Sequence, residues 1–256
     1  MDRLVHTALN ALSNQRDLRV SQAQNLANMN VPGYRRDLPN EGKTYFADSM
    51  NTAMVRAFQT ETGPAGFLEN SGPLQPTGSE LDVAVVDEGY LYIQPEEEGA
   101  EPALTRRGDM HRDVEGFLRN GAGELMLDPE MNPIELQPYK DIQISDIGDI
   151  WVMPVDAPDG AAPLLAGTLA TVIPDDDLVL RKSGDGQIRA EDGSVPNPNQ
   201  LAKLSQGVLE GSNVNSVEEM ISSIEMQRNF ELGLRMITNA SKLDEASARL
   251  LRAPDG

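Results

Sequence analysis

Residues 216–252 read SVEEMISSIEMQRNFELGLRMITNASKLDEASARLLR, a run that contains no proline and one glycine, at position 233. Apolar residues recur along it in steps of three and four, which is the spacing of one face of an α-helix. The resulting seam consists of Met220, Ile224, Gln227, Phe230, Leu234, Ile237, Ser241, Asp244, Ala248 and Leu251. Ser216 and Glu219 have the Ser-x-x-Glu form of a capping box. The stretch therefore predicts a helix that begins at Ser216 and carries an apolar stripe.

A second helix is predicted at the other end of the chain, over residues 2–30, which contain neither Pro nor Gly. It should stop at Val31, because Pro32 disfavours a helical residue before it and Gly33 permits a turn. Its seam consists of Leu4, Ala8, Ala11, Gln15, Leu18, Gln22, Asn25 and Met29. The amides in both seams favour packing in a larger assembly, where a buried amide can fix the register. The alternative is an intramolecular helical hairpin that caps the middle of the chain.

The middle of the chain alternates short β-type runs with turn sequences such as Glu88-Gly89 and Asp159-Gly160. This spacing is typical of an antiparallel sandwich or barrel-like domain. The candidate strands are 81–86, 90–94, 103–106, 116–119, 124–127, 142–145, 150–155, 164–172 and 187–190. We therefore predict an α+β fold in which long N- and C-terminal helices pack as a coiled-coil-like pair, with a central antiparallel β domain. The predicted parts are an N-terminal helix (1–35), a connecting arm (36–80), the β domain (81–193), a second arm (194–212) and a C-terminal helix (213–256).

The composition argues against several classes of function. The formal net charge of −20 argues against nucleic-acid binding, because a phosphate backbone is bound through Lys and Arg. The chain has no cysteine, so disulfides and cysteine-ligated metals are excluded. No apolar run approaches the length of a bilayer span, and the first residues lack the leader of a cleaved secretion signal. Nearly all of the negative charge lies between the two helices, so the near-neutral ends can pack against copies of themselves.

Sequence patterns for catalysis or metal binding are missing. The two histidines, His6 and His111, lie far apart, and neither stands in a catalytic motif. The acidic runs 96–98 and 175–177 lack the spaced ligands of a cation-binding loop, so they are interpreted as solvated loops. Aromatic residues make up 4% of the chain, with one Trp, so the stacking platforms of a sugar-binding cleft are scarce. We predict no enzymatic activity, no cofactor, no metal and no small-molecule substrate.

Several short motifs are spread along the chain. Residues 24–34 read QNLANMNVPGY, residues 209–220 read LEGSNVNSVEEM, and residues 227–231 read QRNFE. Between them stand LQPTG at 74–78, LDVA at 81–84 and TRRGD at 105–109. In sequence and order these motifs resemble those of the flagellar rod and hook protein family. Residues 24–34 resemble its N-terminal signature Asn-Asn-Leu-Ala-Asn-x-x-x-x-Gly-Phe/Tyr, and 209–220 and 227–231 are similar to its C-terminal hallmarks. Within the family, the short start before Leu4 and the form of 209–215 are most similar to proximal rod members.

The resemblance implies a structural subunit of the flagellar basal-body rod that polymerises through its terminal helices and transmits torque for motility. It implies partners that are copies of the chain, other rod proteins and the flagellar type III export apparatus. It also implies a location in the basal body of the bacterial flagellum, in the rod that crosses the periplasm, and export without a cleaved signal peptide. The alternatives are a distal rod or hook-family subunit, or an acidic binding module whose helices cap a β core. The implied assembly residues are Asn25, Leu26, Ala27, Asn28, Gly33, Tyr34, Ser212, Asn213, Val214, Asn215, Glu218, Glu219, Gln227, Arg228, Phe230, Glu231, Leu234 and Ile237.

Overall fold

The computed structural model describes residues 2–38, 43–48, 55–60, 66–97, 99–158 and 160–251. The chain divides into two compact units: unit 1 holds residues 1–27, 37–65 and 215–256, and unit 2 holds residues 28–36 and 66–214. In unit 1 the described elements are the helices α1 (Asp2–Ala27) and α2 (Ser216–Leu251) and the strands β1 (Lys43–Asp48) and β2 (Val55–Thr60). β1 and β2 pair antiparallel, with Lys43 opposite Thr60.

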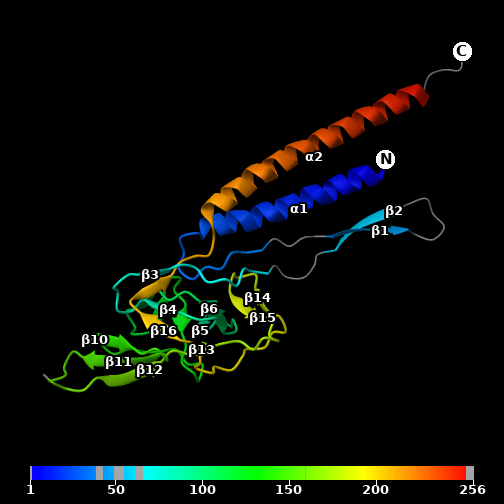
Figure 1. The fold of residues 1–256 in the computed structure, drawn as a ribbon. Coiled ribbons are helices and arrows are strands. Elements are labelled where there is room, and N and C mark those ends of the chain that lie inside the picture. Colours follow the sequence, from blue (N-terminus) through cyan, green and yellow to red (C-terminus); the bar gives the residue numbers. More distant parts are fainter. Residues whose placement is uncertain are drawn as a thin grey trace, which may run out of the picture. The chain divides into compact units, whose positions relative to one another are not determined.

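The two helices of unit 1 lie side by side and run in opposite directions, because the start of α1 and the end of α2 lie at the same end of the pair (Figure 1). The contacts between their described side chains include a hydrogen bond and a cation–π contact. Gln22 donates its side-chain N–H to the backbone oxygen of Glu219. The guanidinium carbon of Arg19 lies 4.8 Å from the ring centroid of Phe230. Polar and cationic groups therefore contribute to this pairing alongside apolar packing.

The predicted fold class is wrong, because the helices do not pack as a coiled-coil-like pair. Side chains are described continuously over 15–27 and 216–239. Within these stretches the predicted seam residues Met220, Ile224 and Leu234 are 55%, 55% and 44% exposed. The seam of α1 offers mainly amides there, and burying an amide without a partner costs free energy. The other regular elements of the described chain are short β-strands.

Unit 2 consists of short strands, and all their described pairings are antiparallel. Its largest sheet has the order β14-β15-β6-β5-β9-β8-β7, with β13 also paired to β5. A second sheet has the order β10-β11-β12, and two strand pairs, β16-β4 and β17-β3, complete the unit. The strands are β3 (Leu74–Pro76), β4 (Val83–Val85), β5 (Tyr90–Gln94), β6 (Ala103–Thr105), β7 (Met110–Arg112), β8 (Leu118–Asn120), β9 (Leu125–Met126), β10 (Tyr139–Ile144), β11 (Asp149–Pro154), β12 (Leu164–Thr168), β13 (Thr171–Val172), β14 (Leu180–Lys182), β15 (Ile188–Ala190), β16 (Leu204–Gln206) and β17 (Val208–Glu210).

Strand β5 lies at the centre of unit 2, because its two faces are buried in two different apolar clusters. Leu91 and Ile93 belong to the larger cluster, to which β10 and β11 contribute Ile142 and Ile150. The alternate residues of β5, such as Tyr92, belong to the second cluster. Successive side chains of a strand point to opposite faces, so one five-residue run supplies both clusters.

Each run predicted as a strand contains at least part of an observed strand, whereas seven further strands lie outside those runs. They are β1, β2, β3, β7, β14, β16 and β17. Most are three residues long and polar, such as Met-His-Arg in β7 and Leu-Arg-Lys in β14. A run of three residues is too short for an alternation of apolar and polar side chains to be recognised.

Candidate assembly interface

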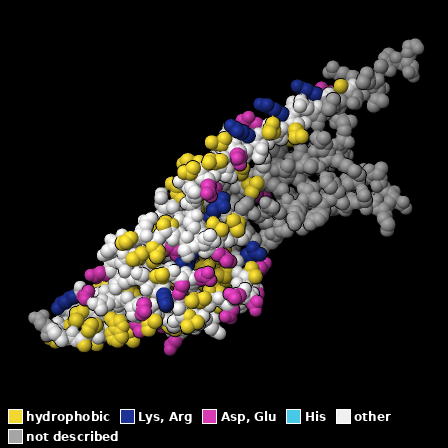
Figure 2. Space-filling view, viewed as in Figure 1, with side chains coloured by type: hydrophobic (Ala, Val, Ile, Leu, Met, Phe, Trp, Pro, Cys, Tyr) yellow, Lys and Arg dark blue, Asp and Glu magenta, His cyan; other side chains and the backbone are white. Residues whose placement is uncertain are grey.

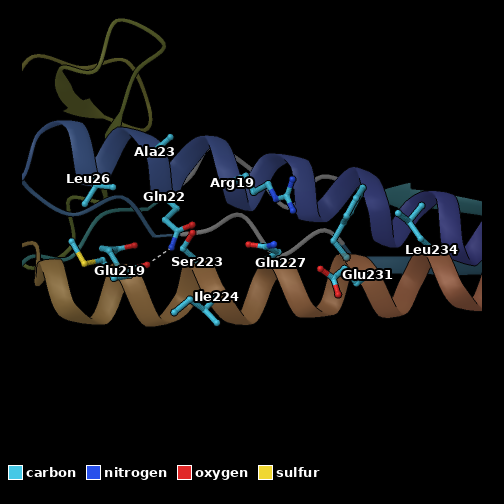
Figure 3. A pocket seen from close by; sticks show the side chains of 12 residues that line it. Arg19, Gln22, Ala23, Leu26, Glu219, Ser223, Ile224, Gln227, Glu231 and Leu234 are labelled. Carbon is cyan, nitrogen blue, oxygen red and sulfur yellow. Dashed lines mark hydrogen bonds between the residues drawn. The ribbon is translucent and has the colours of Figure 1, made fainter.

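A groove of about 940 Å³ lies between the described parts of α1 and α2. Figure 3 shows side chains from both helices along it, with Leu26, Gln22 and Arg19 coming from α1. Six of the predicted assembly residues line this groove, together with residues that the prediction did not include. The six are Leu26, Glu219, Gln227, Phe230, Glu231 and Leu234.

Apolar side chains on α2 are exposed beyond the groove as well as within it. Hydrophobic side chains appear at intervals along the described part of this helix in Figure 2. Those exposed by more than 40% are Val217, Met220, Ile221, Ile224, Leu232, Leu234 and Met236. Single exposed apolar residues are ordinary on a protein surface, but a concentration of them on one helix marks an interaction surface. The predicted residues Arg228 and Ile237 do not line the groove, and Arg228 is exposed.

The N-terminus of α2 is capped by Asn215. Its side-chain oxygen accepts hydrogen bonds from the backbone N–H groups of Val217 and Glu218 at 3.1 and 3.4 Å. Its side-chain nitrogen donates to the Glu218 carboxylate at 3.1 Å. The prediction that Ser216 and Glu219 form the capping box is therefore wrong by one residue. Asn at the N-cap satisfies backbone donors that the first helical turn leaves unpaired.

Asn25, near the end of α1, forms side-chain hydrogen bonds with the backbone of Asp37. Its side-chain oxygen accepts from the backbone N–H of Asp37 at 2.7 Å, and its side-chain nitrogen donates to the backbone oxygen of Asp37 at 3.0 Å. A buried amide that bonds both backbone groups of one residue fixes the course of that segment.

Within unit 2, residues 33–36 run beside residues 210–213. The backbone N–H of Gly33 donates to the backbone oxygen of Glu210 at 2.7 Å, and that of Asn213 donates to the oxygen of Tyr34 at 3.3 Å. The Asn213 side chain accepts from the backbone N–H of Arg36 at 2.6 Å. Gly33 has a φ of +67°, and a Cβ atom there would overlap the backbone of Arg106. The N-terminal and C-terminal motifs of the sequence are thus brought together, at a position that only glycine fits.

A buried ionic cluster lies next to the paired segments 33–36 and 210–213. Glu210 accepts from Arg35 Nη1 at 2.9 Å through Oε1 and from Arg106 Nε at 2.7 Å through Oε2. The side chains of Arg35, Glu210 and Arg106 are 2%, 0% and 1% exposed. Arg106 also donates to the backbone oxygens of Gly89 and Val85, at 2.6 and 2.9 Å.

Burial is the main electrostatic influence on this cluster. It lowers the pKa of Arg35, although the neighbouring Glu210 carboxylate opposes that shift. Burial also raises the pKa of Tyr90, whose ring lies 5.8 Å from the Arg106 guanidinium carbon. Removing one member of such a cluster leaves a buried charge uncompensated, so all three charges act as one unit.

Sequence reasoning missed Arg35, Arg106 and Glu210 as site residues. Each one nevertheless stands within or directly beside a quoted motif: Arg35 follows Gly33-Tyr34, Arg106 lies in 105–109, and Glu210 lies in 209–220. Their mutual partners could not be read from sequence.

The described residues contain no metal-binding arrangement: no three His, Asp or Glu side chains among them gather as metal ligands. Neither helix, over its described length, is apolar enough to cross a membrane.

The comparison with known proteins decides the family. The flagellar basal-body rod protein FlgF of Salmonella typhimurium is 32% identical to the chain over 258 residues, which is 98% of this chain and 99% of the relative. The chain belongs to the FlgF family of flagellar basal-body rod proteins. FlgF of Escherichia coli is 31% identical over 97% of both chains. FlgG of Agrobacterium fabrum, another flagellar basal-body rod protein, is 26% identical over 90% of this chain and 92% of its own.

The C-terminal part of the chain carries a separate match. The family described as "Flagellar basal body rod FlgEFG protein C-terminal" matches residues 205–250, which include β17 and nearly all of α2. The predicted resemblance is therefore confirmed, as are the predicted structural role and the prediction of no enzyme. The chain is a structural subunit of the flagellar basal-body rod.

Proposed function

We propose that this rod subunit polymerises through the apolar surface of α2 and the groove beside it, which neighbouring rod subunits cover, and that the resulting contacts transmit torque. The partners in this proposal are copies of the chain and other flagellar rod proteins. The proposal includes a proximal position in the rod, passage of the rod through the periplasm, and export through the flagellar type III apparatus without a cleaved leader.

The observation that supports this proposal most directly is the exposure of α2. Met220, Ile224 and Leu234 line the groove and are all exposed by more than 40% in the single chain. Covering an apolar side chain of this size stabilises a contact by about 1.5–3 kcal/mol when burial is complete. A helix gains most of its stability from such burial, so a partner that covers α2 would also stabilise the helix.

The division of labour along the chain is part of the same proposal. Residues 1–35 and 213–256 would act as the rod helices, 36–80 and 194–212 as connecting arms, and 81–193 as the β domain. Eleven of the eighteen predicted assembly residues then fall into three groups: the six groove residues, the cap residues Asn215 and Glu218, and the neighbouring residues Gly33, Tyr34 and Asn213 of unit 2.

Charge substitutions in the groove test the proposal. Leu26→Asp and Leu234→Asp should leave the fold of the single chain intact, because both side chains are already exposed, at 39% and 44%. Both should block incorporation into rods, because an unpaired carboxylate in a covered apolar contact is costly. Circular dichroism of the purified chain and swarming of the complemented bacterium provide the two measurements.

Val114→Asp is the matched control, since Val114 is fully exposed in unit 2 and does not line the groove between α1 and α2. It should retain motility. Full motility of both groove variants would refute assembly through this surface. Sedimentation of the chain with purified rod proteins would then distinguish a monomer that ignores them from a subunit with a different interface.

A further inference from the structure

Strand β12 forms an open edge of the sheet β10-β11-β12 in unit 2. Among the described strands it pairs only with β11, so it lies at the edge of this sheet (Figure 1). A strand uses the N–H and C=O groups of alternate residues for one neighbour, and the remaining groups point away from the sheet. β12 therefore presents backbone donors and acceptors to a further strand.

The other edge strands of the two larger sheets carry protection that β12 lacks. On β10, the side-chain amide of Gln206 donates to the backbone oxygen of Ile142 at 3.0 Å and accepts from the backbone N–H of Ile144 at 3.1 Å, so it takes the place of a further strand. β7 and β14 read Met-His-Arg and Leu-Arg-Lys, and charged side chains on an edge oppose pairing with another chain. β12 reads Leu-Leu-Ala-Gly-Thr, without a charge or a proline. Its one irregularity is a bulge at Ala166, and it pairs with β11 on both sides of that bulge.

The exposed side chains at this edge are apolar. Leu165 lies opposite Trp151 of β11, so the two side chains share a face of the sheet, and they are 54% and 39% exposed. Leu164 is 58% exposed. Hydrophobic side chains are visible at this end of unit 2 in Figure 2. A strand added beside β12 would thus gain apolar contacts as well as backbone hydrogen bonds.

The sheet that contains β12 is acidic. Residues 139–168 contain five aspartates and one lysine. Asp149 stands opposite Thr168 and accepts from its hydroxyl at 2.8 Å, so one of these carboxylates lies beside β12 itself. A second copy of the chain would bring the same acidic segment against this one, and like charges repel. A segment with Lys or Arg complements the charge instead.

We propose that β12 is a docking edge for an extended, basic segment of a partner protein, which joins the sheet as a strand beside β12. The backbone of that segment pairs with β12, its apolar side chains contact Leu164 and Leu165, and its Lys or Arg residues face the aspartates of residues 139–168. Backbone pairing supplies affinity in this mode of recognition, and alternate side chains supply specificity. The edge belongs to unit 2, so the inference does not rest on assembly through the groove between α1 and α2.

Titration of the full chain, labelled with ¹⁵N, with a capped Lys-Val-Thr-Val-Thr-Val-Lys peptide tests the edge. The peptide should shift the amide signals of 164–168 and slow their hydrogen exchange, because new backbone hydrogen bonds protect amides. Two matched peptides separate the contributions: one carries N-methyl groups at alternate residues and cannot pair on both sides, and one has Glu in place of both Lys residues. Each should bind about tenfold more weakly or less.

Two variants with equal net charge locate the binding on the chain. Leu165→Lys should weaken binding of the Lys peptide about tenfold or more, because it replaces an apolar contact with a charge of the same sign as the peptide. Val179→Lys is the control, since Val179 is 51% exposed and directly precedes β14 in the other sheet. It should bind as the natural chain does, and unchanged amide signals elsewhere in unit 2 would show that both variants fold.

The proposal is overturned by equal losses in the two variants, by equal binding of the N-methylated or the Glu peptide, or by the absence of changes at 164–168. Changes at 164–168 that appear without peptide as the chain is concentrated would also overturn it, because they would identify a second copy of the chain as the occupant.

Discussion

Gly33 combines a left-handed backbone, with φ of +67°, and direct contact with the backbone of Arg106. A non-glycine residue in this conformation costs about 1–2 kcal/mol, and forcing an extra methyl group into packed structure costs about 1–3 kcal/mol more. We therefore expect Gly33→Ala to lower the free energy of unfolding of unit 2 by at least about 2 kcal/mol. Urea unfolding followed through the fluorescence of Trp151 would measure it.

Gly78→Ala separates the two contributions. Gly78 has a similar φ, +72°, but a Cβ atom there would have no neighbour within 4 Å. Its substitution should therefore cost only the backbone term, about 1–2 kcal/mol. If both variants lose the same free energy of unfolding, the close approach of Gly33 to Arg106 adds nothing to the cost of Gly33→Ala.

Asp113 supports a tight turn in unit 2 and makes its stability depend on pH. Its Oδ2 accepts from Arg119 Nε at 2.7 Å, and its Oδ1 accepts from the backbone N–H groups of Gly116 and Phe117 at 2.8 Å each. The hydrogen bond from Arg119 and the two backbone bonds hold the pKa of the Asp113 carboxyl below its usual value. Its stabilisation is therefore complete above a pH of about 4, and is lost as pH falls through the lower pKa of the folded chain.

Asp113→Asn should accordingly destabilise unit 2 at neutral pH, with a difference from the natural chain that shrinks as the solution becomes more acidic. Urea midpoints measured at a series of pH values would show this. Glu115→Gln is the control for general charge effects, because Glu115 is exposed two residues away. A difference for Asp113→Asn that stays constant down to low pH would contradict the assignment of the carboxylate as the stabilising form.

The N-cap residue of α2, Asn215, should contribute to the stability of the whole helix. Asn215→Ala removes the acceptor for two backbone N–H groups, which should cost about 1 kcal/mol of helix stability. Hydrogen exchange at Val217 and Glu218 should become faster, and the helical signal in circular dichroism should fall. Ser216→Ala should have a much smaller effect, because Ser216 is the first helical residue. A larger loss of helix stability in Ser216→Ala than in Asn215→Ala would show that Ser216 is the N-cap, as the sequence predicts.

The two units of the molecule should differ in their resistance to proteolysis. Unit 2 contains the two buried apolar clusters, whereas the described side chains of α2 are largely exposed. Trypsin should therefore cut at Arg228 and Arg235, which are exposed, long before it cuts at the buried Arg106. Mass spectrometry of a digestion time course would identify the sites. Simultaneous cleavage at all three would show that unit 2 opens as readily as the helices do.

By itself the sequence determined the kind and approximate place of most elements, because those depend on neighbours along the chain. A run without Pro and Gly predicted α2, Pro32 and Gly33 marked the end of the first helix, and turn residues separated the longer strands. It also determined the family, since motifs such as 24–34 and 209–220 are local patterns that need no folded structure to be recognised.

Only the tertiary structure decided what each surface contacts. Periodicity specifies which residues share a face of a helix but not what covers that face, so the predicted coiled-coil pairing was wrong. The short strands β16 and β17 exist through their pairing with β4 and β3, which lie more than 100 residues earlier. The meeting of Arg35, Glu210 and Arg106 likewise depends on long-range folding, because the attraction between charges depends on distance in space, whatever their separation along the chain.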